Sequence, residues 1–242
     1  MKSVILIPAR MESSRFPGKP LAPINGIPMI IVCAKNAMQT GIKTVVCTNS
    51  EDIGSVCKER KVDYIITPDF NTGTDRISWA SKQMGCDLIV NLQGDEPLID
   101  TKNIAKFIST CENEYNQNAN TIWNGIAPID QKFAFDPNNV KAIVNHKSNI
   151  MYMTRKPVRN SARPDLFPMY LKQLGLYGFS NASLEKFSQT KQQRLELSES
   201  IEMMRWLELE KTLKGVQLQC TSISVDTPED LIEAEGLIKD AN

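Results

Sequence analysis

Residues 1–30 read MKSVILIPARMESSRFPGKPLAPINGIPMI, and this passage from an apolar run into a charged loop decides the fold. The run at residues 4–8 is short and apolar, and Arg10, Arg15 and Lys19 follow it. Three cations on one short connection repel one another unless an anion lies among them. When a first strand belongs to a parallel sheet, the loop after it lies at the edge where ligands bind. The stretch therefore predicts a first β-strand that leads into an anion-binding loop.

Segments of strand character and segments of helix character alternate through the first half of the chain. Such alternation is typical of parallel strands joined by right-handed crossovers, with helices on both faces of the sheet. Strands are expected at residues 4–8, 44–48, 64–67 and 88–92, and helices at residues 29–40, 50–60, 75–84 and 101–115. Thr101 is the expected N-cap of the last helix. The sequence therefore predicts an α/β fold with a mostly parallel central sheet.

The second half of the chain changes character. Strands are expected at residues 119–129, 140–144, 150–153, 173–179 and 222–225, and helices at residues 182–189, 199–213 and 228–239. The second and third of these strands are expected to pair antiparallel, and the helix at 199–213 to end in a C-cap at Lys214 and Gly215. Residues 156–170 hold three prolines among charges, which favours an irregular surface excursion. The 242 residues show no internal repeat, so we expect one domain over residues 1–242.

Charge and cysteine content exclude several classes of function. Lys plus Arg and Asp plus Glu both number 28, so no overall basic field exists to attract nucleic acid or an anionic membrane. Six cysteines are scattered without a CxxC pair, as is typical of reduced thiols in a cytoplasmic protein. No run approaches the roughly 20 apolar residues that span a bilayer, and the opening segment reads as a strand rather than a signal peptide. We therefore expect a soluble, cytoplasmic protein whose affinity for anions is local.

The loop after the first strand has the composition of a phosphate site. Gly18 and nearby hydroxyls allow backbone N–H groups to approach a phosphate, while the arginines and Lys19 offer forked and point-charge contacts. The spacing fits neither GxxxxGK[ST] nor GxGxxG, so the loop is no P-loop and no dinucleotide fingerprint. A solvated basic loop is the structural alternative, but its place at the ligand-binding edge favours a polyphosphate.

Two aspartates follow predicted strands. Asp95, in VNLQGDEPLID (residues 90–100), stands where a carboxylate can hold a divalent ion against phosphate oxygens, and Mg²⁺ often takes only one or two protein carboxylates. The alternative is a turn shaped by the glycine and proline of this motif. In SVDTPEDL (residues 224–231), the TPED segment reads as an ordinary helix start, which leaves Asp226 without a structural purpose. A second strand-end carboxylate is what a metal bridging a triphosphate needs.

Weaker signals complete the residue-level interpretation. In NTGTDR, Thr72 and Gly73 resemble a helix N-terminus with exposed N–H groups, and Arg76 lies nearby, although capping alone accounts for most of this pattern. Gln93 has an amide that could hydrogen-bond a substrate hydroxyl. His146 falls in a predicted turn remote from every motif, so we assign it no catalytic part.

The order and spacing of the motifs resemble one family. IPARMESSRFPGKPLAPINGIPMI, NTGTDR, NLQGDEPLI, LGLYGFS and VDTPEDL together resemble the 3-deoxy-manno-octulosonate cytidylyltransferases, or CMP-Kdo synthetases, over nearly the whole chain. The resemblance implies a Rossmann-like nucleotidyltransferase fold and transfer of CMP from CTP to a 2-keto-3-deoxy sugar acid, with release of pyrophosphate, for lipopolysaccharide synthesis. It also implies dependence on Mg²⁺ and a homodimer, with a dimerisation and sugar-binding subregion at residues 130–180.

The resemblance further implies roles for individual residues. The residues implied for the nucleotide are Pro8, Ala9, Arg10, Ser14, Arg15, Lys19, Thr72, Gly73 and Arg76. Those implied for the acidic sugar are Gln93, Arg155 and Tyr177. Asp95 and Asp226 are implied as the Mg²⁺ ligands, and the implied catalytic residues are Arg10, Lys19, Asp95 and Asp226.

Three residues depart from the family pattern. Gln173 stands where the family usually has a histidine, and Arg205 and Trp206 stand where it usually has glutamate and glutamine. The nucleotide half therefore looks intact, whereas the sugar half is open to a different acceptor, such as an amino-substituted octulosonate or a nonulosonate. A non-catalytic CTP-binding regulator is the alternative from another class, and the two strand-end aspartates argue against it. A purely structural module would leave these acids and the basic loop without a purpose.

Overall fold

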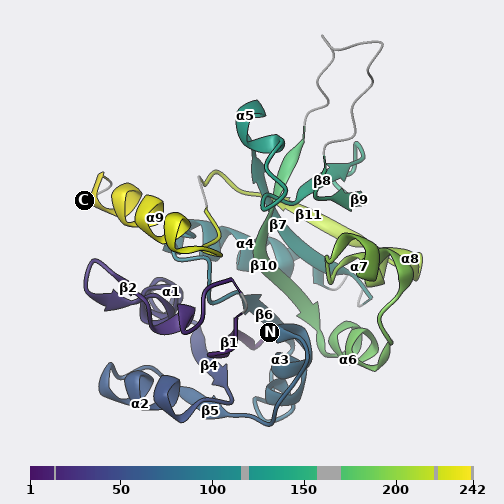
Figure 1. Ribbon diagram of the computed structural model, residues 1–242. Helices are drawn as coiled ribbons and strands as arrows, with labels where there is room; N and C mark the ends of the chain where they lie inside the picture. The colour runs from purple at the N-terminus through teal and green to yellow at the C-terminus, as the bar shows by residue number, and fades with distance from the viewer. Residues whose placement is uncertain (14, 116–119, 157–169, 221–222, 241–242) are drawn as a thin grey trace.

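A computed structural model describes residues 1–13, 15–115, 120–156, 170–220 and 223–240. Within these residues one nine-stranded sheet runs through the middle of the molecule (Figure 1). Its strand order is β11-β7-β10-β6-β1-β4-β5, and β8 attaches to β10 and β9 to β8. The predicted α/β fold with a mostly parallel sheet and a small antiparallel part is confirmed.

The parallel half of the sheet follows the alternation seen in the sequence. Its strands are β1 (Ser3–Ala9), β4 (Lys43–Thr48), β5 (Tyr64–Ile66) and β6 (Leu88–Leu92). β1 pairs in parallel with β4 on one side and β6 on the other, and β5 extends the sheet from β4. The helices of this half are α1 (Met29–Met38), α2 (Glu51–Glu59), α3 (Gly73–Ser81) and α4 (Thr101–Glu114). A one-turn helix η1 (Lys19–Leu21) and a small hairpin of β2 (Pro23–Ile24) and β3 (Ile27–Pro28) lie between β1 and α1.

Burial of β1 on both faces explains why helices cover the sheet on both sides. Successive side chains of a strand point to opposite faces. Ile5 and Ile7 belong to the hydrophobic core that includes α1 and α4, whereas Val4 and Leu6 belong to the core that includes α3. An apolar residue at every position is therefore buried only if helices pack on both faces.

The other half of the sheet is built around β10 (Leu171–Ser180), which runs antiparallel to β6, β7 and β8. The remaining strands are β7 (Ile122–Pro128), β8 (Lys141–Val144), β9 (Ile150–Thr154) and β11 (Leu213–Gln217). β11 is parallel to β7, and β9 is antiparallel to β8. The remaining helices are α5 (Gln131–Ala134), α6 (Asn181–Gln189), α7 (Arg194–Glu199), α8 (Met204–Glu208) and α9 (Pro228–Asp240).

A bulge interrupts β10 at the middle of the sheet. The register of β10 on β7 shifts between Gln173 and Tyr177. Asn124 of β7 is fully buried, and its Nδ2 donates to the carbonyls of Leu174 and Leu176 at 2.9 and 3.0 Å. Residues four apart in a regular strand are separated by about 13 Å. Here Gln173 Nε2 instead donates to the Tyr177 hydroxyl at 2.8 Å, so the irregular stretch brings the two side chains together.

The C-terminal helix α9 returns to the beginning of the chain. In Figure 1 it lies beside α1 and β2. Ala234 of α9 and Val225 before it pack with Ile24 and Met29, and the N–H of Asn25 donates to Glu235 Oε1 at 2.8 Å. The segment before α9 therefore lies against the loop that follows β1. In the described chain, no helix has both the length and the apolar character that crossing a bilayer requires.

Several element boundaries differ from the prediction. The N-cap of α4 is Asp100 rather than Thr101, because Asp100 Oδ1 accepts from the N–H of Asn103 at 2.7 Å. The Thr101 hydroxyl instead donates to the carbonyl of Asn36 at 3.0 Å. The prediction of a single helix at residues 199–213 is also wrong.

That predicted helix is divided by backbone geometry. Ser200 has a left-handed φ of 54°, which ends α7, and α8 follows as a separate short helix. Lys214 and Gly215 lie inside the strand β11 and not in a C-cap. A strand was also predicted at residues 222–225. Among the described residues of this range, 223–225, no strand forms, so that part of the prediction is wrong. Most of the predicted excursion, residues 157–169, falls outside the described residues.

Candidate active site

Two adjoining cavities open at the carboxyl ends of β1 and β6. The loop cavity has a volume of about 320 Å³ and is lined by the loop after β1, the start of α3 and the end of β6. The bulge cavity has a volume of about 200 Å³. It is lined by the bulge of β10, by Arg155 directly after β9 and by residues around Ser200. Gln93, Asp95, Glu202 and Asp226 line both cavities. A ligand in either cavity therefore lies against the same four side chains.

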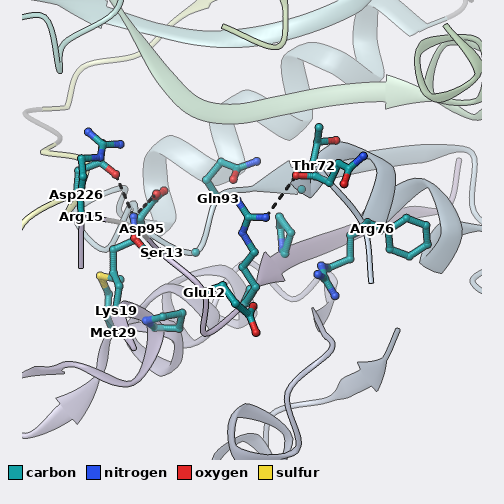
Figure 2. Close-up of a pocket in the computed structure, with 18 of the residues that line it drawn as sticks. Glu12, Ser13, Arg15, Lys19, Met29, Thr72, Arg76, Gln93, Asp95 and Asp226 are labelled. Carbon is teal, nitrogen blue, oxygen red and sulfur yellow. Dashed lines mark hydrogen bonds and ion pairs between the residues drawn. The ribbon is translucent and has the colours of Figure 1, made fainter. Parts of the chain in front are cut away.

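The loop after β1 is folded on itself by one glycine. Gly18 has a positive φ of 72°, a conformation that glycine adopts without steric cost, and its N–H donates to the carbonyl of Met11 at 3.0 Å. The turn begins η1, whose first residue is Lys19. Figure 2 shows Lys19, Arg15, Asp95 and Asp226 gathered at one end of the loop cavity.

The cations of this loop meet the two predicted aspartates. Lys19 Nζ lies 2.8 Å from Asp95 Oδ2 and 3.1 Å from Asp226 Oδ1, and Arg15 NH2 lies 3.0 Å from Asp226 Oδ2. The Lys19 side chain is only 13% exposed. Burial acts to lower the pKa of Lys19, but the charges and hydrogen bonds of both aspartates outweigh it and raise that pKa above its usual value. The lysine is therefore held as a cation between two carboxylates.

The other end of the loop cavity is formed by the start of α3 and the residues before it. The Thr72 side chain caps α3 by accepting from the N–H of Asp75 at 3.1 Å. Arg10 NH1 donates to the carbonyl of Asn71 at 3.4 Å, so Arg10 bridges the two loops. A Cβ on Gly73 would lie 3.1 Å from Pro8 Cγ, and glycine thus lets α3 approach the end of β1.

Arg76 is a buried cation at this end of the cavity. It is 2% exposed, and its NH1 donates to the Thr67 hydroxyl and to the carbonyl of Pro68. Its guanidinium lies 6.0 Å from the centre of the Phe70 ring. Burial and the nearby charge of Arg10 lower the pKa of Arg76. Figure 2 shows Arg76 and Thr72 at the opposite side of the cavity from the Lys19 cluster.

The bulge cavity brings the predicted sugar-binding residues together. Gln93, Arg155 and Tyr177 all line it. Arg155 Nε, NH1 and NH2 donate to the carbonyls of Glu199, Pro137 and Ser200, each at 3.0 Å. These three bonds fix the plane of the guanidinium at the cavity wall. Burial, together with the charge of nearby acids, raises the pKa of Tyr177 well above its usual value.

Comparison with known proteins identifies the family. A family model described as cytidylyltransferase matches residues 4–214. The chain belongs to the cytidylyltransferase family.

Named relatives of this cytidylyltransferase match over nearly their whole length. It is 36% identical to a 3-deoxy-manno-octulosonate cytidylyltransferase of Chlorobium phaeovibrioides, over 94% of this chain and 92% of the relative. It is 38% identical to an 8-amino-3,8-dideoxy-manno-octulosonate cytidylyltransferase of Shewanella halifaxensis, over 96% of both chains.

Solved structures give the same result for the fold. The cytidylyltransferase matches the structure of a CMP:2-keto-3-deoxy-manno-octonic acid synthetase complexed with CTP over the whole of both chains, with a TM-score of 0.91 and 29% identity. A glucose-1-phosphate thymidylyltransferase structure from Bacillus anthracis, at 18% identity and a TM-score of 0.70, shares the fold alone.

Most of the residues predicted from the sequence lie in these two cavities. The loop cavity contains Pro8, Ala9, Arg10, Arg15, Lys19, Thr72, Gly73 and Arg76. Ser14 lies outside the described residues. His146 is exposed on the turn between β8 and β9 and lines neither cavity. The structure thus gathers the candidates of the cytidylyltransferase, while their individual roles stay predictions.

Of the residues expected to alter the sugar half, Arg205 and Trp206 line neither of these two cavities. Arg205 forms a buried bidentate ion pair with Glu196, at 2.7 and 2.6 Å, and its guanidinium lies 4.4 Å from the centre of the Phe187 ring. Trp206 is fully buried and donates to the carbonyl of Thr212 at 2.9 Å. Of the three departures only Gln173 lines the bulge cavity.

Sequence reasoning missed several cavity residues. Glu202 lines both cavities, and Glu96, Asn138, Lys172 and Ser224 line the bulge cavity. Glu96 belongs to the NLQGDEP motif, so its neighbours gave a signal that could have found it. Glu202 follows the break at Ser200 in what looked like one continuous helix. It keeps the first glutamate of the family segment from which Arg205 and Trp206 depart, and that match was a signal that could have found it.

Glu202 makes the stability of the cytidylyltransferase depend on pH. Burial raises its pKa above the usual 4.5, as do Asp75 and Glu196, although Thr74, which hydrogen-bonds the carboxylate, and Arg205 oppose the shift. A carboxyl with a raised folded-state pKa contributes stability that is complete below pH 4.5 and is lost as the pH rises through the folded-state pKa. Glu202→Gln has no carboxyl group to ionise, so this loss of stability at higher pH is absent from the variant.

We therefore expect the melting temperature of the wild type to fall relative to Glu202→Gln as the pH is raised from 4.5 to 8. Thermal melts at several pH values measure the difference. Glu229→Gln, at an exposed position of α9, is the control that should follow the wild type. Parallel curves for wild type and Glu202→Gln would contradict the expectation.

Proposed function

We propose that the protein transfers CMP from CTP to the anomeric hydroxyl of a 2-keto-3-deoxy sugar acid, with release of pyrophosphate. The convergence of Arg15 and Lys19 with Asp95 and Asp226, at the junction of the two cavities, carries the proposal. A cytidylyltransferase needs cations for the leaving pyrophosphate next to a cavity for the acceptor. The names of the two relatives supply the class of acceptor.

The loop cavity is proposed to bind CTP. Arg10, Arg15 and Lys19 would hold the triphosphate, since forked and point-charge donors suit phosphate oxygens. The backbone of Pro8 and Ala9 and the Thr72–Gly73 region would border the cytosine, with Arg76 beside it. In this orientation the triphosphate and the base would occupy separate ends of the cavity, since the Lys19 cluster and the Arg76 end lie on opposite sides of it.

The residues around Lys19 fit a magnesium ion. Asp95 and Asp226 already flank one cation, the Lys19 ammonium, and carboxylate oxygens are the ligands that Mg²⁺ prefers. Among the described residues no cluster of three or more His, Cys, Asp or Glu could hold a metal, but Mg²⁺ at a nucleotide needs only one or two carboxylates. We propose Asp95 and Asp226 as its protein ligands. When bound, the ion would neutralise phosphate charge and polarise the attacking hydroxyl.

The bulge cavity is proposed to bind the acceptor. Arg155 would pair with the sugar carboxylate, because it is a cation that lines the bulge cavity and three carbonyls fix the plane of its guanidinium. Gln93 and Tyr177 would hydrogen-bond sugar hydroxyls. Binding in adjoining cavities would bring the anomeric oxygen to the α-phosphorus.

In the reaction the anomeric oxygen bonds to the α-phosphorus and releases its proton. The bond from the α-phosphorus to the oxygen bridging to the β-phosphate breaks, and pyrophosphate leaves with the electron pair. Lys19 and the loop arginines would stabilise the charge that develops on the leaving group.

We further propose that the protein works in the cytoplasm as a homodimer, without nucleic-acid or membrane partners. Six separate cysteines without a disulfide among them, five of them buried, suit a reducing compartment. Phe133, Phe135 and Met151 are 42–55% exposed, and all three lie within residues 130–180, where dimerisation is expected. The mass of the particle in solution tests this arrangement.

Pyrophosphate release with CTP and Mg²⁺, measured across a panel of acidic sugars, tests the proposed function. The panel contains the 2-keto-3-deoxy octulosonate, its 8-amino analogue and a nonulosonate, and each is repeated with UTP. Gln173 in the bulge cavity makes the amino analogue the specific second candidate. Release with an octulosonate supports the proposal. No release with any acid, despite binding of CTP, would favour a non-catalytic regulator.

A further inference from the structure

Glu96 is a buried carboxylate in the NLQGDEP motif to which the reaction above gives no part. It is 2% exposed and lines the bulge cavity. Its Oε1 accepts from the N–H of Gly175 at 2.8 Å and from the Ser224 hydroxyl at 2.7 Å. Gly175 is 79 residues and Ser224 128 residues from Glu96 in the chain. One carboxylate oxygen therefore joins two segments that are remote in sequence.

The first of these segments is the bulge of β10. Gly175 lies inside the bulge, between Gln173 and Tyr177, and its carbonyl accepts from the N–H of Gln93 at 2.7 Å. A Cβ on Gly175 would lie 2.8 Å from Glu96 Cγ and 2.9 Å from Gln93 Cβ. Only glycine therefore permits this close approach. The bulge of β10, which forms one wall of the proposed acceptor cavity (the acceptor wall), thus packs directly on the NLQGDEP motif.

The second segment leads to Asp226. Ser224 comes two residues before it, and the N–H of Val225 donates to the carbonyl of Asp95 at 2.9 Å. Residues 223–226 belong to no helix or strand, so these bonds, the packing of Val225 and the bond from the N–H of Asp226 to Asp230 Oδ2 at 2.9 Å set their position. The position of Asp226 fixes its distance from Lys19.

We propose that Glu96 is a positioning residue that holds the acceptor wall and the Asp226 segment at one fixed separation. The inference rests on the proposed function for what the two segments do. A single oxygen that receives both donors transmits the position of one segment to the other. One side chain that touches neither reacting atom then aligns the proposed acceptor cavity with the proposed magnesium and triphosphate site at Asp226.

Steady-state kinetics of Glu96→Ala and Glu96→Gln test the proposal. Glu96→Ala is expected to lower kcat/KM for the acceptor about 10–100-fold and to raise the Mg²⁺ concentration for half-maximal activity, as losses of supporting contacts do. KM for CTP should stay within about twofold, since the loop cavity keeps its own contacts. Glu96→Gln retains an acceptor oxygen at the same place and should restore most of the loss.

Two further variants act on the link at different points. Ser224→Ala removes only the bond to the Asp226 segment and should raise the Mg²⁺ requirement with little change in acceptor KM. Gly175→Ala displaces the shared carboxylate, since a Cβ there would lie 2.8 Å from Glu96 Cγ, and should raise both acceptor KM and the Mg²⁺ requirement. In the double variant Glu96→Ala/Ser224→Ala, the Mg²⁺ requirement should equal that of Glu96→Ala alone, because the bond is already lost.

Glu112→Ala is the matched control for a merely structural effect. Glu112 of α4 accepts from the Ser3 hydroxyl at 2.6 Å, far from both cavities, so its loss should lower the melting temperature without changing acceptor KM or the Mg²⁺ requirement. The proposal is overturned if Glu96→Ala behaves like this control. It is also overturned if Glu96→Gln is as impaired as Glu96→Ala, since the charge would then act directly.

Amide hydrogen exchange distinguishes failure of this inference from failure of the proposed function. If the wild type releases no pyrophosphate with any acid, the proposed function is wrong, and exchange still tests the link. Glu96→Ala should then speed exchange at Gly175 and at residues 223–226 together. Faster exchange at only one of these places, or at neither, overturns the link whatever the enzyme's activity.

Discussion

Replacing Lys19 with alanine is expected to lower kcat for CTP-dependent pyrophosphate release by about 10²–10³-fold, the cost of removing one preorganised charge donor. Two effects act together. The developing charge on the leaving pyrophosphate loses a cation, and Asp95 and Asp226 are left as neighbouring carboxylates without the ammonium that now lies 2.8 and 3.1 Å away. Initial rates at saturating CTP and acceptor, with circular dichroism to confirm folding, measure the effect.

Lys35→Ala is the matched control for the Lys19 variant. Lys35 is an exposed lysine on α1, which follows the same loop, and it lines neither cavity. Its removal should leave kcat unchanged. An unchanged rate for a folded Lys19→Ala protein would show that the loop cavity does not hold the phosphates.

Neutralising either aspartate is expected to have an effect of similar size. Asp95→Asn and Asp226→Asn keep the shape of each side chain but remove its charge, and a Mg²⁺ ion bound by one or two carboxylates depends on both charge and geometry. We expect kcat to fall about 10²–10³-fold, as for loss of a charge that stabilises the transition state. Binding of Mn²⁺, followed by electron paramagnetic resonance with a non-hydrolysable CTP analogue, should weaken in parallel.

The Mn²⁺ measurement separates a metal ligand from a residue that only steadies Lys19. If each variant loses activity while the affinity for Mn²⁺ is that of the wild type, the carboxylates serve the lysine and not a metal. Asp52→Asn, at an exposed position of α2, should change neither quantity.

The sequence predicted the parallel half of the sheet well because three of its strands, β1, β4 and β6, are buried on both faces. An apolar run such as that of β1 has one physical explanation in a chain where helices alternate with strands. The meeting of Lys19 with Asp95 was predictable for the same reason, since loops after parallel strands gather at one edge. The comparison structures then add the family but do not alter this arrangement.

The other parts of the fold and of the site depend on contacts between residues that no local sequence pattern records. Asp226 lies in the predicted place for a different reason, since the bond from Val225 to Asp95 positions it and no strand does. Arg205 looked like a change of charge in the sugar half, yet it forms a buried ion pair with Glu196, nine residues earlier, and lines neither cavity. The bulge of β10 depends on the buried Asn124 of another strand, and a sequence gives no sign of such a pairing.

The return of α9 to the start of the chain has a consequence for protein synthesis. Lys19 and Asp226 are separated by 207 residues, and Asp226 reaches the lysine only when the segment before α9 packs against the hairpin of β2 and β3. A nascent chain on the ribosome can already form β1 and its loop, but Asp226 cannot reach Lys19 until α9 has emerged and packed. The proposed site therefore gains Asp226 only after α9 has left the ribosome.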